Sequence, residues 1–182
     1  RGAAWFTEMG TEESTGCRLV SVSGDCDRPG VYELPLGIRV EELLEEVGGE
    51  GARAVLVGGA SGVLLGPSGF DRTLAYEDIA ASGAVVVIGP EREMLDVAKN
   101  VLAFFVRQSC GRCTACREGS RRLLDGVREA RAGRLSSERL GDLVELGETM
   151  RLASKCGLGQ RSSSVFLTLV RAFGGELLGR GG

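Results

Sequence analysis

Three cysteines stand close together in the sequence, and their spacing is the feature best able to carry chemistry. Cys110, Cys113 and Cys116 are each separated by two residues in the stretch SCGRCTACREG. Neighbouring side chains of a straight strand point to opposite faces, so the backbone must curl for three thiols to converge. Gly111 follows the first cysteine and would help the backbone to bend. Cys156, in the stretch SKCGLGQRSS, is the candidate fourth member of the group.

Four cysteines arranged as a triplet and one distant residue favour a single metal centre. Four thiolates hold a 4Fe–4S cluster, and four thiolates can also bind structural zinc. Structural zinc more often uses paired Cys-x-x-Cys knuckles, whereas the triplet with one distant cysteine is typical of an iron–sulfur site. The sequence has no histidine, which excludes mixed Cys/His metal sites and His-dependent triads. We therefore predict one 4Fe–4S cluster, with tetrathiolate zinc or unliganded redox thiols as the alternatives.

Two further cysteines and two arginines are less specific signals. Cys17 and Cys26 flank a strand pattern and have no Cys-x-x-Cys partner. We interpret them as small, half-buried residues, with a mutual disulfide as the alternative. Arg112 and Arg117 flank the triplet and would reduce the negative charge of bound thiolates, unless they are ordinary solvated residues.

The first half of the chain has the pattern of short strands and turns. The β-branched runs RLVSVSG, GVYELP, RAVLVGG and GAVVVIG are separated by glycine and proline. A helix is predicted between the second and third runs, with an apolar face made by Val40, Leu43, Leu44 and Val47. The order β-β-α-β, an irregular stretch and a last strand at about 84–88 predicts a small α+β domain of the ubiquitin-like, β-grasp kind. We interpret the irregular stretch VGGASGVLLGPSG as a turn-rich connector, with a ligand-binding loop as the alternative.

From Glu91 onward the apolar period becomes helical and predicts four helices with short connections, which make an antiparallel bundle. The expected core positions are Met94, Val97, Val101, Phe104, Phe105, Leu123, Leu124, Val127, Leu140, Leu143, Val144, Leu146, Val165, Phe166, Leu169, Val170 and Phe173. The cysteine triplet falls in the first connection and Cys156 in the third. These two connections lie at the same end of an up-down-up-down bundle, so the bundle is expected to bring the four sulfurs together.

With the triplet, CREG and CGLGQ in view, the chain resembles the C-terminal part of the NADH-oxidising flavoprotein subunit of respiratory complex I. The same subunit type occurs in NAD-linked hydrogenases and formate dehydrogenases. The resemblance implies that a hydride passes from NADH to FMN and that electrons then leave singly through a 4Fe–4S cluster. It also implies Leu158 on the flavin side of the cluster and these cluster ligands: Cys110, Cys113, Cys116 and Cys156.

The resemblance also implies a domain plan and a set of partners. Residues 1–16 would be the tail of a flavin domain that is absent here, 17–90 a soluble-ligand-binding β-grasp domain, and 91–182 a four-helix cluster domain. FMN and NADH would bind only in the full-length subunit, so this chain alone is not expected to oxidise NADH. The partners would be the flavin domain in cis, and a 2Fe–2S thioredoxin-like subunit and a larger iron–sulfur subunit in trans.

Composition limits the remaining possibilities. The formal net charge is -3 with the charges interspersed, so no nucleic-acid footprint is expected. No apolar run reaches about 18 residues, so no membrane span is expected. The start RGAAWFTEMG has neither an initiator Met nor a signal-peptide pattern, which we interpret as a fragment of a longer protein.

We expect a cytoplasmic electron-transfer module of an NADH:acceptor (quinone-type) oxidoreductase, or one peripheral on the cytoplasmic membrane face through a complex. The alternative is a zinc-stapled interaction module without redox function.

Overall fold

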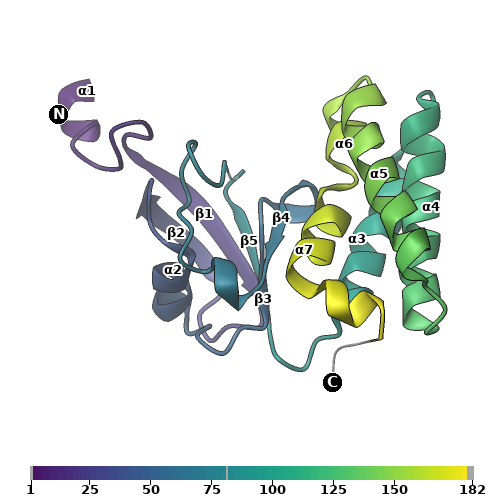
Figure 1. The fold of residues 1–182 in the computed structure, drawn as a ribbon. Helices are drawn as coiled ribbons and strands as arrows, with labels where there is room; N and C mark the ends of the chain where they lie inside the picture. Colours follow the sequence, from purple (N-terminus) through teal and green to yellow (C-terminus); the bar gives the residue numbers. More distant parts are fainter. Residues whose placement is uncertain (1, 81, 180–182) are drawn as a thin grey trace. The chain divides into compact units, whose positions relative to one another are not determined.

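The computed structural model describes residues 2–80 and 82–179. The chain divides into two compact units, Arg1–Glu91 and Arg92–Gly182. The first unit contains all the strands of the described residues and the second contains helices only, as the ribbon in Figure 1 shows. The fold is therefore of the α+β class, as the sequence predicts.

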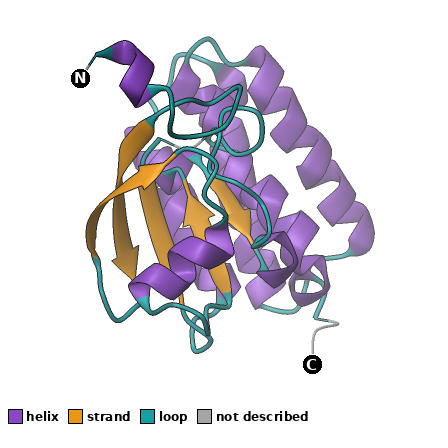
Figure 2. Ribbon diagram, turned by 90° about the vertical axis from the view of Figure 1, so that its left-hand side faces the viewer, coloured by secondary structure: helices purple, strands orange, loops and turns teal. Residues whose placement is uncertain are grey.

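In the described part of the first unit, five strands form one mixed sheet with the order β2-β1-β5-β3-β4. β1 pairs in parallel with β5, and the other neighbours are antiparallel. Figure 2 shows these strands side by side in a twisted sheet. The elements are α1 (Ala3–Phe6), β1 (Cys17–Gly24), β2 (Gly30–Pro35), α2 (Val40–Val47), β3 (Ala54–Val57), β4 (Val63–Leu65) and β5 (Ala84–Ile88), with 3-10 turns at Gly59–Ser61 and Pro67–Gly69.

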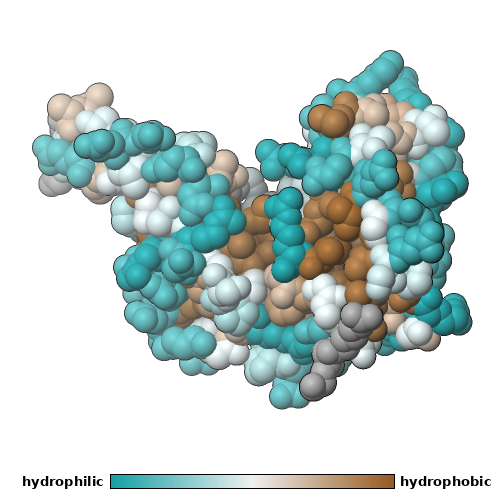
Figure 3. Space-filling model, viewed as in Figure 1, coloured by the Kyte–Doolittle hydropathy of each residue, from teal (hydrophilic) through white to brown (hydrophobic). Residues whose placement is uncertain are grey.

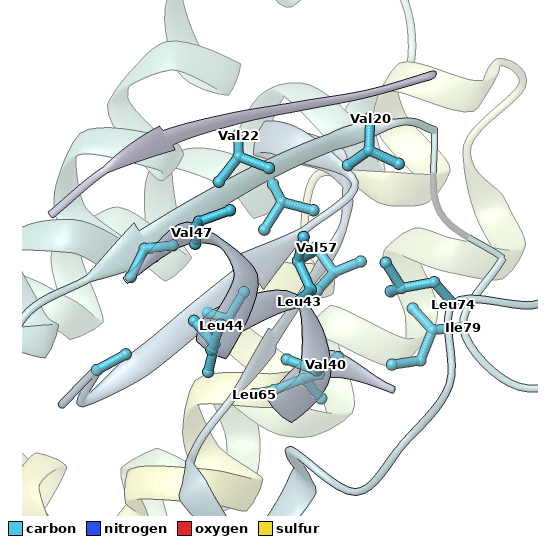
Figure 4. Packing of buried hydrophobic residues seen from close by; sticks show 14 of the residues in the cluster. Val20, Val22, Val40, Leu43, Leu44, Val47, Val57, Leu65, Leu74 and Ile79 are labelled. Carbon is cyan, nitrogen blue, oxygen red and sulfur yellow. The ribbon is translucent and has the colours of Figure 1, made fainter. Parts of the chain in front are cut away.

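Helix α2 lies across one face of this sheet and forms the core with it. The four apolar residues predicted for its inner face are all buried. They pack against side chains of β1, β3, β4 and β5, among them Val20, Val57 and Leu65 (Figure 4). Burying each Val or Leu side chain stabilises the fold by roughly 1.5–3 kcal/mol. The helix ends at Gly48, whose φ of 67° is left-handed backbone that glycine adopts without strain.

The stretch interpreted as a turn-rich connector contains an unpredicted strand, β4, paired antiparallel with β3. Three residues are too few to show an alternating pattern, so pairing with β3 decides their conformation. Gly62 makes the tight turn between the two strands possible. A Cβ at this position would collide with the backbone carbonyl of Val57.

Over residues 92–179, the second unit contains the four predicted helices and one short additional helix. Its elements are α3 (Met94–Gln108), α4 (Thr114–Arg131), α5 (Ser137–Ala153), α6 (Gly157–Arg161) and α7 (Ser164–Leu177). Ser136 caps α5, because its Oγ accepts a hydrogen bond of 3.1 Å from the backbone N–H of Arg139. Helix α6 occupies the connection between α5 and α7, for which the sequence pattern predicts no helix. Within the described residues, no helix is long and apolar enough to cross a membrane.

The buried row of α3 differs from the prediction. Met94 and Phe105 are buried as expected, but Ala98 and Leu102 complete the row, and Phe104 is 40% exposed. Other predicted core positions are only half-buried: Val97, Val101, Val144, Leu146, Val170 and Phe173. Two apolar rows lie side by side on α3, and periodicity alone does not say which row its neighbours bury.

Small residues let α4 and α5 approach closely. A Cβ at Gly119 would collide with Met150, and one at Gly126 would collide with Leu143. These glycines are seven residues apart, or about two helical turns, so they mark one face of α4. The opposite side of the unit along α4 is hydrophilic, which the teal right-hand edge of Figure 3 shows.

Candidate metal centre

The four predicted cysteines line one small cavity. Cys110, Cys113 and Cys116 come from the α3–α4 connection and the first turn of α4, and Cys156 comes from the α5–α6 connection. Both connections lie at the end of the helical unit where α6 is labelled in Figure 1. The cavity measures about 90 Å³ and is predominantly apolar. Leu158, assigned to the flavin side by resemblance, also lines it.

The triplet curls as its spacing requires. Gly111 has a φ of 79°, the left-handed conformation that turns the chain directly after Cys110. Cys113 is the N-cap residue of α4, and Cys116 is buried in the first turn of that helix. The Nη1 of Arg117 donates a hydrogen bond of 2.8 Å to the carbonyl of Gly111 and closes the loop. The start of α4 and the left-handed turn at Gly111 therefore set the positions of the three sulfur atoms of the triplet.

Arg117 and Arg112 have different environments. The Nε of Arg117 lies 2.7 Å from Oε1 of Glu118, so its guanidinium is engaged by the loop carbonyl and by this carboxylate. Arg112 is exposed between the first two cysteines. Arg117 thus has a structural role in the loop, and Arg112 is an exposed positive charge in the loop between two of the cavity cysteines.

Backbone N–H groups favour the thiolate of the fourth cysteine. Cys156 is the N-cap residue of the short helix α6. Hydrogen bonds from the N–H of Gly159, and secondarily of Leu158, lower the pKa of the Cys156 thiol. The side-chain Nε2 of Gln160, in α6, donates a hydrogen bond of 3.0 Å to the backbone carbonyl of Ser154. This bond fixes the backbone that leads into Cys156. A thiol with a lowered pKa more readily gives the thiolate, which is the form that binds metal.

Four thiolates are the ligand set of a 4Fe–4S cluster, and zinc can use the same set. Four thiolates around one zinc would lie ~3.8 Å apart, given a Zn–S bond of about 2.3 Å. In residues 2–80 and 82–179, no three Cys, His, Asp or Glu side chains gather closely enough to hold one ion. A cubane binds each thiolate through a different iron, which requires a wider separation of the sulfurs.

Three further residues form the wall of the site, and no sequence motif singles them out. Ser109 approaches Cys116 with 3.5 Å between Oγ and Sγ. Gly159 leaves room for its neighbours, because a Cβ there would lie 2.6 Å from the Cβ of Ser154 and 3.0 Å from that of Cys116. Ser154 is buried, and its Oγ has no hydrogen-bond partner. Their nearness to cysteines along the chain is the only signal that the sequence offers.

The remaining two cysteines do not take part in this site. Cys17 and Cys26 are both half-buried, as expected from the sequence, and in this structure both are free thiols. The Sγ of Cys17 donates a hydrogen bond of 3.0 Å to Oε1 of Glu33, and this contact raises the pKa of the thiol. Cys26 packs against the core beneath α2. Both residues lie in the first unit, in the strand region.

Two family models match the chain in consecutive regions. Residues 96–180 match the NADH-ubiquinone oxidoreductase-F iron-sulfur binding region, which includes all four cavity cysteines. Residues 19–63 match the SLBB domain. The helical unit thus contains a 4Fe–4S binding region, in agreement with the chemistry of its donor set.

Two relatives match nearly the whole chain. The chain is 41% identical over 174 residues to the NAD-reducing hydrogenase HoxS subunit alpha of Cupriavidus necator, covering 94% of this chain and 29% of that one. It is 34% identical over 187 residues to the F subunit of NADH-quinone oxidoreductase from Mycobacterium tuberculosis, covering 97% of this chain and 42% of that one.

A solved structure agrees with these relatives. The crystal structure of NAD+-reducing [NiFe]-hydrogenase in the H2-reduced state matches with a TM-score of 0.91 and 35% identity, covering 99% of this chain and 32% of that one. The chain therefore spans about a third of the length of the hydrogenase subunits that it matches. It contains an SLBB domain and an NADH-ubiquinone oxidoreductase-F iron-sulfur binding region, and it is similar to part of the F subunit of NADH-quinone oxidoreductase and of the alpha subunit of NAD-reducing hydrogenase.

Proposed function

We propose that this chain is the electron-transfer module of an NADH:acceptor oxidoreductase of the quinone type, linking a flavin domain to an iron–sulfur partner subunit. The observation that carries the proposal is the convergence of four cysteines on one cavity inside a 4Fe–4S binding region. Cys110, Cys113, Cys116 and Cys156 would hold the cluster. When bound, a 4Fe–4S cluster supplies one-electron transfer, and the protein contributes ligands, burial and hydrogen bonds.

The site supports a cluster more than the zinc alternative. The region that contains all four cysteines matches an iron-sulfur binding region, which supports iron–sulfur rather than zinc. The N–H groups that donate to Cys156 favour the thiolate that either centre requires. Zinc would be the preferred occupant only if metal analysis found it without iron, and the chain would then be a structural interaction module.

The domain plan and cofactors of the longer protein follow from the same proposal. We assign residues 17–90 to the β-grasp domain, 91–182 to the cluster domain and 1–16 to the tail of a flavin domain. FMN and NADH would bind to the longer subunit, with Leu158 on the flavin side of the cluster. Such a module would work in the cytoplasm, or at the cytoplasmic face of a membrane as part of a complex.

The charges around the cavity support docking of an acidic partner. Residues 107–118 and 154–161 contain five basic side chains and one acid, Glu118, which is paired with Arg117. Arg107, Arg112, Lys155 and Arg161 are exposed. The unit Arg92–Gly182 has 16 Lys and Arg against 10 Asp and Glu, whereas Arg1–Glu91 has 6 against 15. A positive rim around an electron-transfer site would steer an acidic partner toward it. We propose the larger iron–sulfur subunit as that partner, with a 2Fe–2S thioredoxin-like subunit in the same complex.

Metal and sulfide analysis of the anaerobically purified chain tests the proposal. About four iron and four acid-labile sulfide per chain, with a broad visible absorption that bleaches on reduction, are expected for one cubane. Zinc without iron, persisting after anaerobic reconstitution with iron and sulfide, would overturn the redox function and leave a structural zinc site.

A further inference from the structure

Ser154 carries a buried hydroxyl that the structure leaves without a partner at the wall of the cysteine cavity. The residue is only 4% exposed, and its Oγ has no hydrogen-bond partner. Ser154 lines the cavity together with the four cysteines. Buried hydroxyls in proteins are nearly always hydrogen-bonded, so one that is not calls for an explanation such as an ion or group bound nearby.

The backbone N–H and carbonyl of Ser154 both make hydrogen bonds, so the position of the residue is fixed and only its hydroxyl lacks a partner. Its N–H donates to the carbonyl of Met150 at 3.2 Å, ending α5. Its carbonyl accepts from the side chain of Gln160 at 3.0 Å. The side chain is confined by Gly159, where a Cβ would lie 2.7 Å from Oγ. The hydroxyl therefore stays beside the cavity and is shielded from solvent.

The acceptors that line this cavity include the sulfur atoms of its four cysteines. The Cβ of Cys116 also borders Gly159, so Ser154 and Cys116 flank the same glycine. The other serine of the wall, Ser109, already contacts the Sγ of Cys116 and accepts from the N–H of Gly111 at 3.3 Å. A thiolate or a cluster sulfide carries negative charge and accepts a hydrogen bond more strongly than a thiol does.

We propose that the Ser154 hydroxyl donates a hydrogen bond to a sulfur of the bound 4Fe–4S cluster or of its thiolate ligands, and thereby raises the reduction potential of the cluster. The inference rests on the proposed function, since it requires a cluster. Hydrogen bonds to the sulfurs of a cluster are one of the factors that set its potential. The reduced cluster has one more negative charge, so a donated hydrogen bond stabilises it more than the oxidised form.

The chain supplies a matched control in Ser120. This residue is fully buried in α4, and its Oγ is likewise without a partner, but it is not among the residues that line the cavity. Replacing either serine by alanine removes one buried, unpaired hydroxyl from the helical unit. Only Ser154→Ala removes a hydroxyl beside the sulfurs.

The test is a redox titration of the reconstituted chain, followed by electron paramagnetic resonance of the reduced cluster. For Ser154→Ala, the ratio of reduced to oxidised cluster at a fixed potential is expected to fall at least about threefold. That change equals about 30 mV for a one-electron couple, at 59 mV per factor of ten. Ser120→Ala is expected to titrate like the unmodified chain, and Ser154→Thr, which keeps the hydroxyl, is expected to stay near it.

An unchanged potential in Ser154→Ala with a full complement of iron would overturn the proposal, and so would equal shifts in Ser154→Ala and Ser120→Ala. If Ser154→Ala does not retain iron, Ser154→Gly, which also removes the hydroxyl, decides. A threefold fall in the reduced fraction then supports the hydrogen bond, and a potential like that of the unmodified chain refutes it. Absence of iron from the unmodified chain would instead be a failure of the proposed function, which the metal analysis reports separately.

Discussion

Replacing Gly159 by alanine should disrupt the wall of the cysteine cavity. An added Cβ would lie 2.6 Å from the Cβ and 2.7 Å from the Oγ of Ser154, and 3.0 Å from the Cβ of Cys116. Both neighbours are short side chains close to the backbone, so neither can swing away as a long side chain could. The methyl group must therefore displace α6, the end of α5 or the start of α4, all of which hold the site.

The size of the effect follows from comparison with Gly157→Ala. Gly157 lies in the same short helix, and a Cβ there would meet nothing within 4 Å. The helix-propensity gain of glycine to alanine, up to about 1 kcal/mol, is common to both variants. The difference between them is thus the overpacking cost, which is about 1–3 kcal/mol for an inserted methylene in a packed interior. In a domain of this size, each kcal/mol lowers the melting temperature by about 4–8 °C.

Thermal unfolding of the helical unit and iron content per chain measure this prediction. Gly159→Ala should melt at least about 4 °C below Gly157→Ala, and it should bind less iron because Cys116 and Cys156 are displaced. Gly157→Ala should bind iron like the unmodified chain. Equal melting temperatures and equal iron content in the two variants would show that the wall is not packed as described.

Three further predictions test the site and its surroundings. Changing any one of the four cavity cysteines to serine should abolish the stable cluster, measured as iron and sulfide, whereas Cys26→Ser should leave both unchanged; loss of iron in Cys26→Ser would contradict the ligand assignment. Arg112→Glu should slow electron transfer to the iron–sulfur partner in the assembled complex and weaken its dependence on salt, because the rim loses positive charge. The control Arg128→Glu changes the same charge at the other end of α4, and an equal effect there would argue against docking at the cavity. The hydrogen bond from Cys17 to Glu33 raises the pKa of the thiol, so less thiolate is present at a given pH below that pKa. Glu33→Gln should therefore speed alkylation of Cys17 near pH 8, as followed by peptide mass spectrometry, and an unchanged rate would count against the contact.

Local patterns in the sequence are sufficient to predict several features of this protein. The buried face of α2 is predicted in full, because four apolar residues at helical spacing have one way to be buried. The cysteine spacing identifies the candidate ligands, since few centres use three closely spaced thiolates and a fourth from far along the chain. The position of Gly111 directly after Cys110 predicts a bend in the backbone, and its positive φ confirms this.

Other features depend on contacts between distant segments, which the sequence does not state. The buried row of α3 runs through Ala98 and Leu102 rather than through Val97 and Val101, because neighbouring helices bury one of two adjacent apolar rows. Strand β4 forms because β3 offers it hydrogen bonds, although three residues have no pattern of their own.

The wall of the candidate site also depends on contacts between segments that are distant in the sequence. Ser154 is an ordinary helix-ending serine in the sequence, and only the packing of α5, α6 and α4 places it beside the cavity with an unpartnered hydroxyl. Gly159 looks like one glycine among 29 until its neighbours show how little room a side chain would have. The sequence determined which atoms could bind the metal, because ligand chemistry is a property of residue type. The tertiary structure decided which atoms surround those ligands, because burial and distance exist only after the helices have packed.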